Sequence, residues 1–166
     1  MKKLWFKKKS YVHGSGLFAV QNIKKGLKII EYIGEKVTKK EGDKRADKQI
    51  KQYKKNKNNG MVYIFELNKH YDIDGSVKYN HARLINHSCS PNCEVEIDNN
   101  EIWILAIKKI KKNTELSYNY GYAYDEDYVD HICQCGSYKC VGYILDEDHW
   151  PKLKKAKKRK VIKSLI

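Results

Sequence analysis

The sequence predicts a mainly β fold of several small sheets with few short helices. Between Tyr11 and Leu145 the chain is divided into short apolar or alternating runs, turn signals separate them closely, and only one segment has helical spacing. A chain of 166 residues has the length of one domain with small appendages. No apolar run approaches the roughly 18 residues of a membrane helix, so we expect no contact with a membrane.

The N-terminal half supplies two strand-like runs and one helix. They are predicted, in order, at residues 17–20, 27–33 and 38–53. The helix is indicated by Thr38 and Glu41, which have the spacing of a capping box, and by apolar residues at helical spacing after them. It is expected to be weak and largely solvated, because charged residues surround its few apolar positions.

The rest of the chain alternates strands and turns. Strand-like runs are predicted at residues 62–67, 94–97, 101–106 and 115–120. Asp98-Asn99-Asn100 joins the second and third of these runs and is a hairpin signal. We therefore expect at least one antiparallel hairpin here.

The net charge of +14 is concentrated at the C-terminal end. Residues 151–166 carry eight basic residues and no acids, and this tail is predicted to be a basic helix or a disordered segment. All but three of the 34 basic residues are lysines, which lack the fork geometry that reads base edges. We expect at most loose, non-specific contact between residues 151–166 and nucleic acid.

Five cysteines favour a metal site over a disulfide framework. Cys133, Cys135 and Cys140 form a C-x-C-x4-C cluster that offers three thiolates within eight residues. A structural zinc site takes four ligands, and from the residues alone either Cys89 or Cys93 can supply the fourth. The alternative is a loop with free cysteines.

Three further patterns bear on function. Asn86-His87 lies among apolar positions. It is equally compatible with a functional site and with a turn whose side chains are hydrogen-bonded locally. Tyr118, Tyr120 and Tyr122 alternate, which puts them on one face of a strand. They form either ordinary aromatic pairs of a sheet or a tunnel whose ring faces attract an ammonium group. Seven acids between residues 125 and 148 either line the approach of a basic peptide or form a solvated loop.

Five motifs, in this order, resemble those of the SET-domain protein-lysine N-methyltransferases. They are residues 13–19 (HGSGLFA), 31–35 (EYIGE), 73–74 (ID), 80–92 with NHSC at 86–89, and 115–121 (ELSYNYG). The cysteine cluster resembles the family's post-SET zinc module, and no pre-SET module is recognised.

The resemblance implies a SET-domain, β-clip-like fold with a C-terminal pseudoknot, in which the segment around Tyr120 lies beside residues 86–89. The implied organisation is a basic lead (1–9), a SET domain (10–122), a post-SET zinc-binding segment (123–150) and a basic tail (151–166).

The implied activity is transfer of methyl groups from S-adenosylmethionine to a lysine amine of a histone or another basic protein. Tyr120 is the expected catalytic residue, Tyr32 is expected to line the lysine channel, and Tyr118 to govern how many methyl groups fit. The residues expected to bind the cofactor are His13, Gly14, Ser15, Gly16, Leu17, Tyr63, Asn86, His87 and Gln134. The implied ligands of one structural zinc are Cys89, Cys133, Cys135 and Cys140. Gly75, where the family often has alanine, and Tyr79, where it often has glycine, are not expected to touch the chemistry.

The alternative is a non-enzymatic zinc module that binds nucleic acid or chromatin through its basic ends. Such a module has no need for Tyr32, Tyr118 and Tyr120 together with Asn86-His87. The basic start lacks the apolar stretch of a secretory signal, so we expect an intracellular, cytoplasmic protein. Residues 154–160 resemble a nuclear-localisation patch, which leaves a nuclear or chromatin-associated location in its own or a host cell open.

Overall fold

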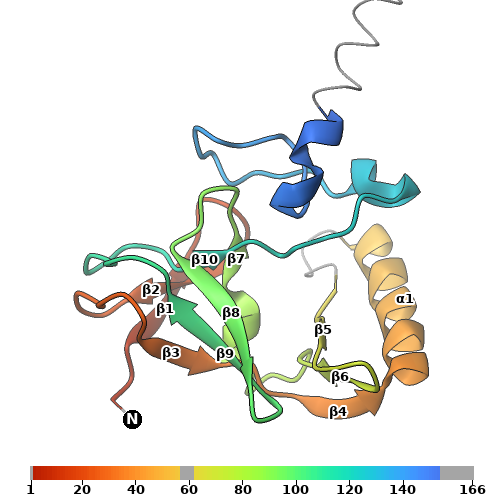
Figure 1. The fold of residues 1–166 in the computed structure, drawn as a ribbon, viewed down its shortest axis with the longest axis horizontal. Coiled ribbons are helices and arrows are strands. Elements are labelled where there is room, and N and C mark those ends of the chain that lie inside the picture. Colours follow the sequence, from red (N-terminus) through yellow and green to blue (C-terminus); the bar gives the residue numbers. More distant parts are fainter. Residues whose placement is uncertain (1, 57–61, 154–166) are drawn as a thin grey trace, which may run out of the picture.

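The computed structural model describes residues 2–56 and 62–153, and within them ten short strands form four small sheets beside one long helix (Figure 1). The elements are β1 (Trp5–Lys9), β2 (Ser15–Ala19), β3 (Lys28–Glu31), β4 (Glu35–Thr38), α1 (Lys39–Lys55), β5 (Ile64–Glu66), β6 (Tyr71–Asp74), η1 (His81–Leu84), β7 (Asn86–His87), β8 (Cys93–Asp98), β9 (Glu101–Ala106), β10 (Ser117–Tyr118), η2 (Glu126–Asp130) and η3 (Glu147–His149), where η denotes a 3-10 helix. The prediction of a mainly β fold of small sheets is confirmed.

The basic start of the chain contains a strand of the core. β1 pairs antiparallel with β2, with Trp5 opposite Ala19 and Lys9 opposite Ser15. Trp5 is only 8% exposed and packs into the main hydrophobic cluster. Residues 5–9 of the expected basic lead therefore belong to the folded core, and the predicted domain boundaries stay predictions.

The central sheet has the strand order β3-β9-β8 and carries much of the core. The predicted hairpin joins β8 to β9, with Asp98 opposite Glu101. Asn99 and Asn100 have φ values of 50° and 62°, the left-handed conformation that asparagine tolerates and that a tight two-residue turn requires. On the inner face Ile104 is fully buried.

The sheet β4-β6-β5 lies beside the central sheet, and α1 packs against it (Figure 1). The predicted cap is confirmed, because Thr38 Oγ1 accepts a hydrogen bond from the Glu41 N–H at 3.4 Å. The expected solvated character is also confirmed: Gly42 is the only fully buried residue of this 17-residue helix. The stability of α1 therefore depends on its polar contacts with the sheet.

Arg45 makes most of those contacts. Its guanidinium donates to Glu41 at 2.9 Å, to Glu35 at 2.7 Å and to the buried Asp74 at 3.0 Å. Burial alone would raise the pKa of Asp74, but hydrogen bonds from Ser76 and Arg45 hold it below its usual value. The Arg45 hydrogen bond also lowers the pKa of Glu35. Arg45 thus joins α1 to β4 and β6.

A short parallel pairing connects segments that are far apart in sequence. β10 pairs with β7, with Ser117 opposite Asn86 and Tyr118 opposite His87. The Ser88 N–H donates to the Tyr118 carbonyl at 3.1 Å and extends this ladder. The expected adjacency of the Tyr120 segment and residues 86–89 is confirmed, although the strand is shorter than the predicted run 115–120.

The segment after Tyr122 folds over β7 and β10 (Figure 1). It contains η2, η3 and the isolated bridge between Ile132 and Tyr143. Residues 154–166 of the predicted basic tail, with the patch 154–160, lie outside the described residues. None of the described helices is both long and apolar enough to cross a membrane.

The Arg45 network predicts a pH-dependent contribution to stability. Folding lowers the pKa of Asp74 and Glu35, so their contribution is present above the unfolded values of about 4 and is lost as the pH falls through the folded values. Arg45→Ala should therefore lower the Tm most near neutral pH, and the difference from wild type should shrink in acid. Thermal unfolding followed by circular dichroism across this range measures it. The exposed Lys51→Ala is the control, and a Tm difference for Arg45→Ala that does not change with pH would contradict the assignment.

Candidate functional site

Tyrosine rings gather where β10 ends. The ring centroids of Tyr118 and Tyr120 are 5.0 Å apart, and those of Tyr120 and Tyr122 are 5.8 Å apart. Tyr32 joins from the other side through Phe65, whose ring centroid lies 5.1 Å from that of Tyr32 and 6.3 Å from that of Tyr118. The structure thus brings the three expected catalytic tyrosines into one aromatic cluster.

Tyr120 is fixed at both its backbone and its hydroxyl. Its N–H donates to His87 Nδ1 at 3.2 Å, and its hydroxyl donates to the Ile85 carbonyl at 2.9 Å. Burial raises the pKa of Tyr120 well above its usual value, so the phenol stays neutral. Because its hydrogen is committed to Ile85, the lone pairs of the oxygen remain available to a positively polarised group.

His87 connects Tyr120 to the cysteine cluster. Burial lowers the pKa of His87 to about 4, so its ring is neutral near pH 7. Since Nδ1 accepts from Tyr120, the ring proton lies on Nε2, which faces the Cys89 sulfur at 3.5 Å. Both ring nitrogens of this expected cofactor residue therefore contact protein groups.

Tyr32 is 4% exposed, and its hydroxyl donates to the Tyr63 carbonyl at 2.8 Å. Its ring lies directly against Gly75: a Cβ added at Gly75 would lie closer than 3.0 Å to two ring atoms of Tyr32. Gly75 therefore contacts the ring of Tyr32, and the expectation that this residue does not touch the chemistry stays a prediction.

The loop of residues 13–17 is held to β7 by one amide. Asn86 Nδ2 donates to Glu115 Oε1 at 2.8 Å and lies 3.4 and 3.5 Å from the carbonyl oxygens of His13 and Ser15. His13 and Gly14 are exposed, whereas Gly16 and Leu17 are buried. The loop therefore presents its first residues to solvent while β2 anchors the rest.

Sequence reasoning missed Glu115 as a member of this site. Glu115 Oε1 accepts hydrogen bonds from Ser10 at 2.7 Å and from Asn86, and a Cβ at Gly16 would collide with the same carboxylate. The sequence signal that could have indicated Glu115 is that it is the single acid, between Thr114 and the apolar Leu116, of an otherwise strand-like run. Glu115 thus fixes both the loop and Asn86.

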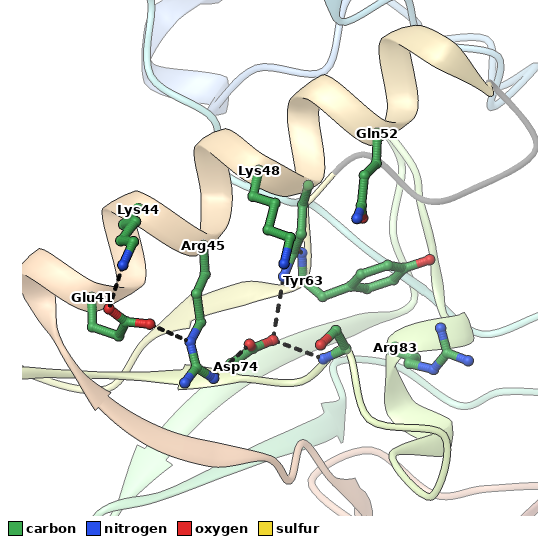
Figure 2. A pocket seen from close by; sticks show the side chains of 10 residues that line it. Glu41, Lys44, Arg45, Lys48, Gln52, Tyr63, Asp74 and Arg83 are labelled. Atoms are coloured by element: carbon green, nitrogen blue, oxygen red, sulfur yellow. Dashed lines mark hydrogen bonds and ion pairs between the residues drawn. The ribbon is translucent and has the colours of Figure 1, made fainter.

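A cavity of about 670 Å³ opens between α1, β6 and η1 (Figure 2). Tyr63 and Arg83 lie side by side at one end of it, with the Arg83 guanidinium 5.2 Å from the centre of the Tyr63 ring. Arg83 Nε is buried without a hydrogen-bond partner among the described residues, another feature that sequence reasoning missed. The lining includes Tyr63 but none of residues 13–17, Asn86 or His87, so these expected cofactor residues do not share this cavity.

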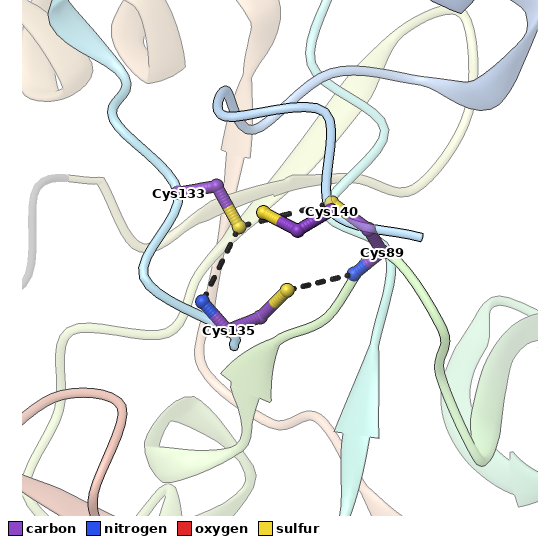
Figure 3. A group of neighbouring side chains, drawn as sticks. All are labelled: Cys89, Cys133, Cys135 and Cys140. Carbon is purple, nitrogen blue, oxygen red and sulfur yellow. Dashed lines mark hydrogen bonds between the residues drawn. The ribbon is translucent and has the colours of Figure 1, made fainter. Parts of the chain in front are cut away.

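Four cysteine sulfurs converge between residue 89 and the C-terminal segment (Figure 3). The sulfurs of Cys89, Cys133, Cys135 and Cys140 all lie within 4.8 Å of one another. Those of Cys89 and Cys133 are 3.7 Å apart, close to the spacing of about 3.8 Å expected for tetrahedral zinc with bonds of about 2.3 Å. Cys93 lies elsewhere, in β8, with its thiol donating to Asn92 Oδ1 at 3.3 Å. Of the two open choices for a fourth ligand, the geometry therefore favours Cys89.

The thiols of this cluster have different acidities. Burial raises the pKa of Cys89 to about 11 and also raises the pKa of Cys133. Burial acts on Cys135 in the same direction, but hydrogen bonding with Ser137 and with the Cys89 N–H lowers its pKa to about 6. Gln134 is exposed between two of the cysteines. The donor set can hold a metal ion, and a tetrahedral ion with four sulfur ligands would have no open position.

The acidic segment is partly structural. Asp125 accepts from the Asp127 N–H at 3.1 Å and caps η2, and Asp146 accepts from the Asp148 N–H at 2.9 Å and caps η3. Glu126 and Glu147 are exposed beside these caps. The caps explain two of the acids locally, and most of the other acids of the segment are exposed.

Comparison with known proteins gives consistent matches. The sequence model of the family described as "SET domain" matches residues 14–121. The H3 lysine-4 specific histone-lysine N-methyltransferase of Aspergillus oryzae is 38% identical over 141 residues, covering 82% of this chain and 11% of that protein. Histone-lysine N-methyltransferase set-2 of Caenorhabditis elegans is 34% identical over 140 residues, covering 82% and 9%. Histone-lysine N-methyltransferase trithorax of Drosophila virilis is 32% identical over 140 residues, covering 82% and 3%. The chain spans about a tenth or less of the length of these relatives.

Proposed function

The chain belongs to the SET-domain family, and on this premise we propose that it is an S-adenosylmethionine-dependent protein-lysine N-methyltransferase. The observation that carries the proposal is the fixation of Tyr120 by His87 and Ile85 inside the tyrosine cluster. A nucleic-acid-binding module would not need a buried phenol whose lone pairs stay unused. That alternative depends on the two basic ends of the chain, and residues 154–166 of the C-terminal end lie outside the described residues.

The chain offers groups suited to the cofactor. Bound S-adenosylmethionine would supply an electrophilic methyl group on a positively charged sulfur. We propose that the residues 13–17 loop, Asn86, His87, Tyr63 and Gln134 hold it. Gly14 has a φ of 48° and nothing within 4 Å of the place where a Cβ would be, so its backbone is open to close approach.

The tyrosine cluster suits a lysine substrate. Free lysine has a pKa of about 10.4, so its amine is protonated near neutral pH. Transfer into a buried aromatic channel favours the neutral amine, which has the reactive lone pair. Burial raises the pKa of Tyr32 and Tyr118, so these phenols stay neutral and can line the channel without charge. We propose that Tyr120 directs its oxygen at the transferring methyl group. Tyr118, whose side chain is nearest Tyr120 in the cluster, would limit how many methyl groups fit.

The cysteine cluster would hold one structural zinc through Cys89, Cys133, Cys135 and Cys140. The compatible sulfur spacing and the all-sulfur donor set support this assignment. The ion would favour the thiolate form of all four cysteines and fix the segment after Tyr122 against residue 89. Through His87, the same ion would stabilise the backbone at Tyr120.

The proposed substrate is a basic protein, with a histone as the first candidate. The relatives are named histone-lysine N-methyltransferases. The name of the Aspergillus oryzae relative adds that it is H3 lysine-4 specific, and the Drosophila virilis relative is named trithorax. The exposed acids near η2 and η3 suit the approach of a basic peptide. A nuclear or chromatin-associated location follows from this substrate.

Tyr120→Phe tests the catalytic assignment. The change removes one oxygen and little volume, so cofactor binding should survive while the rate of methyl transfer falls by about two decades, the scale of losing one transition-state polar contact. Labelled methyl transfer to histones and calorimetry of cofactor binding measure the two effects. Tyr11→Phe, at a tyrosine that is 97% exposed, is the control. Turnover of Tyr120→Phe within a few fold of wild type would remove Tyr120 from the proposed role.

Elemental analysis of cysteine variants tests the zinc assignment. Cys135→Ser should lose most of one equivalent of zinc and lower the Tm, because metal binding and folding are coupled. Cys93→Ser should keep the zinc, since this thiol lies apart from the cluster. If Cys135→Ser retains a full equivalent, or if Cys93→Ser loses it, the ligand set is wrong.

A further inference from the structure

We propose that an exposed lysine surface binds the phosphate backbone of a nucleic-acid duplex without reading its sequence. The surface is formed by two connections, the one between β2 and β3 and the one between β9 and β10. Its six lysines, all exposed, are Lys24, Lys25, Lys108, Lys109, Lys111 and Lys112, which we call the lysine patch. The patch is separate from the tyrosine cluster and from residues 151–166.

The backbone holds the two connections together. Ile23 and Ile110 form an isolated antiparallel bridge, in which the Ile23 N–H donates at 2.8 Å and the Ile110 N–H donates back at 2.9 Å. The Asn22 side chain accepts from the Lys112 N–H at 2.9 Å. Figure 1 shows the two connections at the end of the molecule that lies away from α1. The patch is therefore a defined surface of the fold.

The bridge directs lysines outward. Ile23 and Ile110 are 1% and 2% exposed, whereas their neighbours Lys24, Lys109 and Lys111 are exposed. Continued by one residue, the register of the bridge puts Lys24 across from Lys109. Like charges at opposed positions destabilise a strand pair, so this arrangement does not serve the stability of the fold.

The patch has no compensating acid. Residues 16–27 and 104–114 contain neither Asp nor Glu. Within the described part of the chain, no lysine of the patch forms an ion pair. The next acid in sequence, Glu115, instead accepts hydrogen bonds from Ser10 and Asn86.

Lysines elsewhere on the molecule are paired with carboxylates. Lys28 lies 2.8 Å from Asp98, and Lys39 lies 2.7 Å from Asp72. The contrast shows that the charge of the patch is left uncompensated at one place. Such a surface attracts a polyanion.

The side chains of the patch favour a duplex among the polyanions. The patch contains no arginine, so it suits contacts with phosphates and does not suit bidentate reading of base edges. Residues 16–27 and 104–114 expose no aromatic ring on which the bases of a single strand could stack. Leu27, at 44%, is their only exposed large apolar side chain, which is too little to anchor a membrane surface or a protein interface.

A triple variant of the full chain tests the proposal: Lys24→Gln, Lys109→Gln and Lys111→Gln. Fluorescence anisotropy measures its affinity for labelled duplexes of DNA and of RNA, because both carry the same phosphate chemistry, and their comparison shows which duplex the chain prefers. The affinity of the variant should fall by about tenfold or more at low salt. The slope of log affinity against log salt should decrease by roughly two to three, since each lysine–phosphate contact contributes about 0.9.

The matched control removes three exposed lysines of α1 through Lys40→Gln, Lys51→Gln and Lys55→Gln. It has the same net charge as the patch variant, and both keep residues 154–166, so it should lose less than about threefold in affinity. The measurement needs no methyl transfer, so its outcome is independent of the proposed function.

Three results would overturn the proposal. The first is unchanged duplex affinity in the patch variant. The second is an equal loss in the control, which would reduce the effect to net charge. The third is tighter binding of the wild-type chain to poly-glutamate or to phosphatidylserine vesicles than to either duplex, which would indicate an acidic protein or a membrane surface instead.

Discussion

The parallel pairing of β7 with β10 is the constraint on which the site depends. Two residue pairs, Asn86 with Ser117 and His87 with Tyr118, align segments some thirty positions apart in the chain. This register puts the Tyr120 N–H on His87 and the Tyr120 hydroxyl on Ile85. The same two residues of β7 reach outward, Asn86 to the 13–17 loop and His87 to the Cys89 sulfur. A shift of the pairing by one residue would separate all of these contacts.

The second determinant is the packing of α1 against β4 and β6. Because this helix is nearly all polar, it buries little apolar area against the sheet. Hydrogen bonds from Arg45 and Gln49 to Asp74 hold it there instead. Those contacts also orient Tyr63 and, through it, Tyr32. The tyrosine cluster is therefore built from two sides: β10 fixes Tyr118 and Tyr120, and the α1 sheet fixes Tyr32.

Much of this could be predicted from local sequence, because the responsible interactions are local. Asn99-Asn100 marks its turn through the left-handed conformation that it adopts, and Thr38 marks the start of α1 through its capping oxygen. Motif order indicated the family. Contacts between distant segments had no such signal in the sequence. The approach of Cys89 rather than Cys93 to the other three sulfurs depends on how the segments pack in three dimensions. The same holds for the hydrogen bond between Asn86 and Glu115 and for the contact of Tyr32 with Gly75.

The central claim is that this chain methylates lysine at the tyrosine cluster. The most direct measurement is tandem mass spectrometry of core histones after incubation with the purified wild-type chain and S-adenosylmethionine carrying a deuterated methyl group. The account predicts that the heavy methyl label appears on lysine side chains and is absent when the chain is omitted. Cofactor-dependent labelling of a residue other than lysine, or no label on any histone or on the chain itself despite measured cofactor binding, would contradict it.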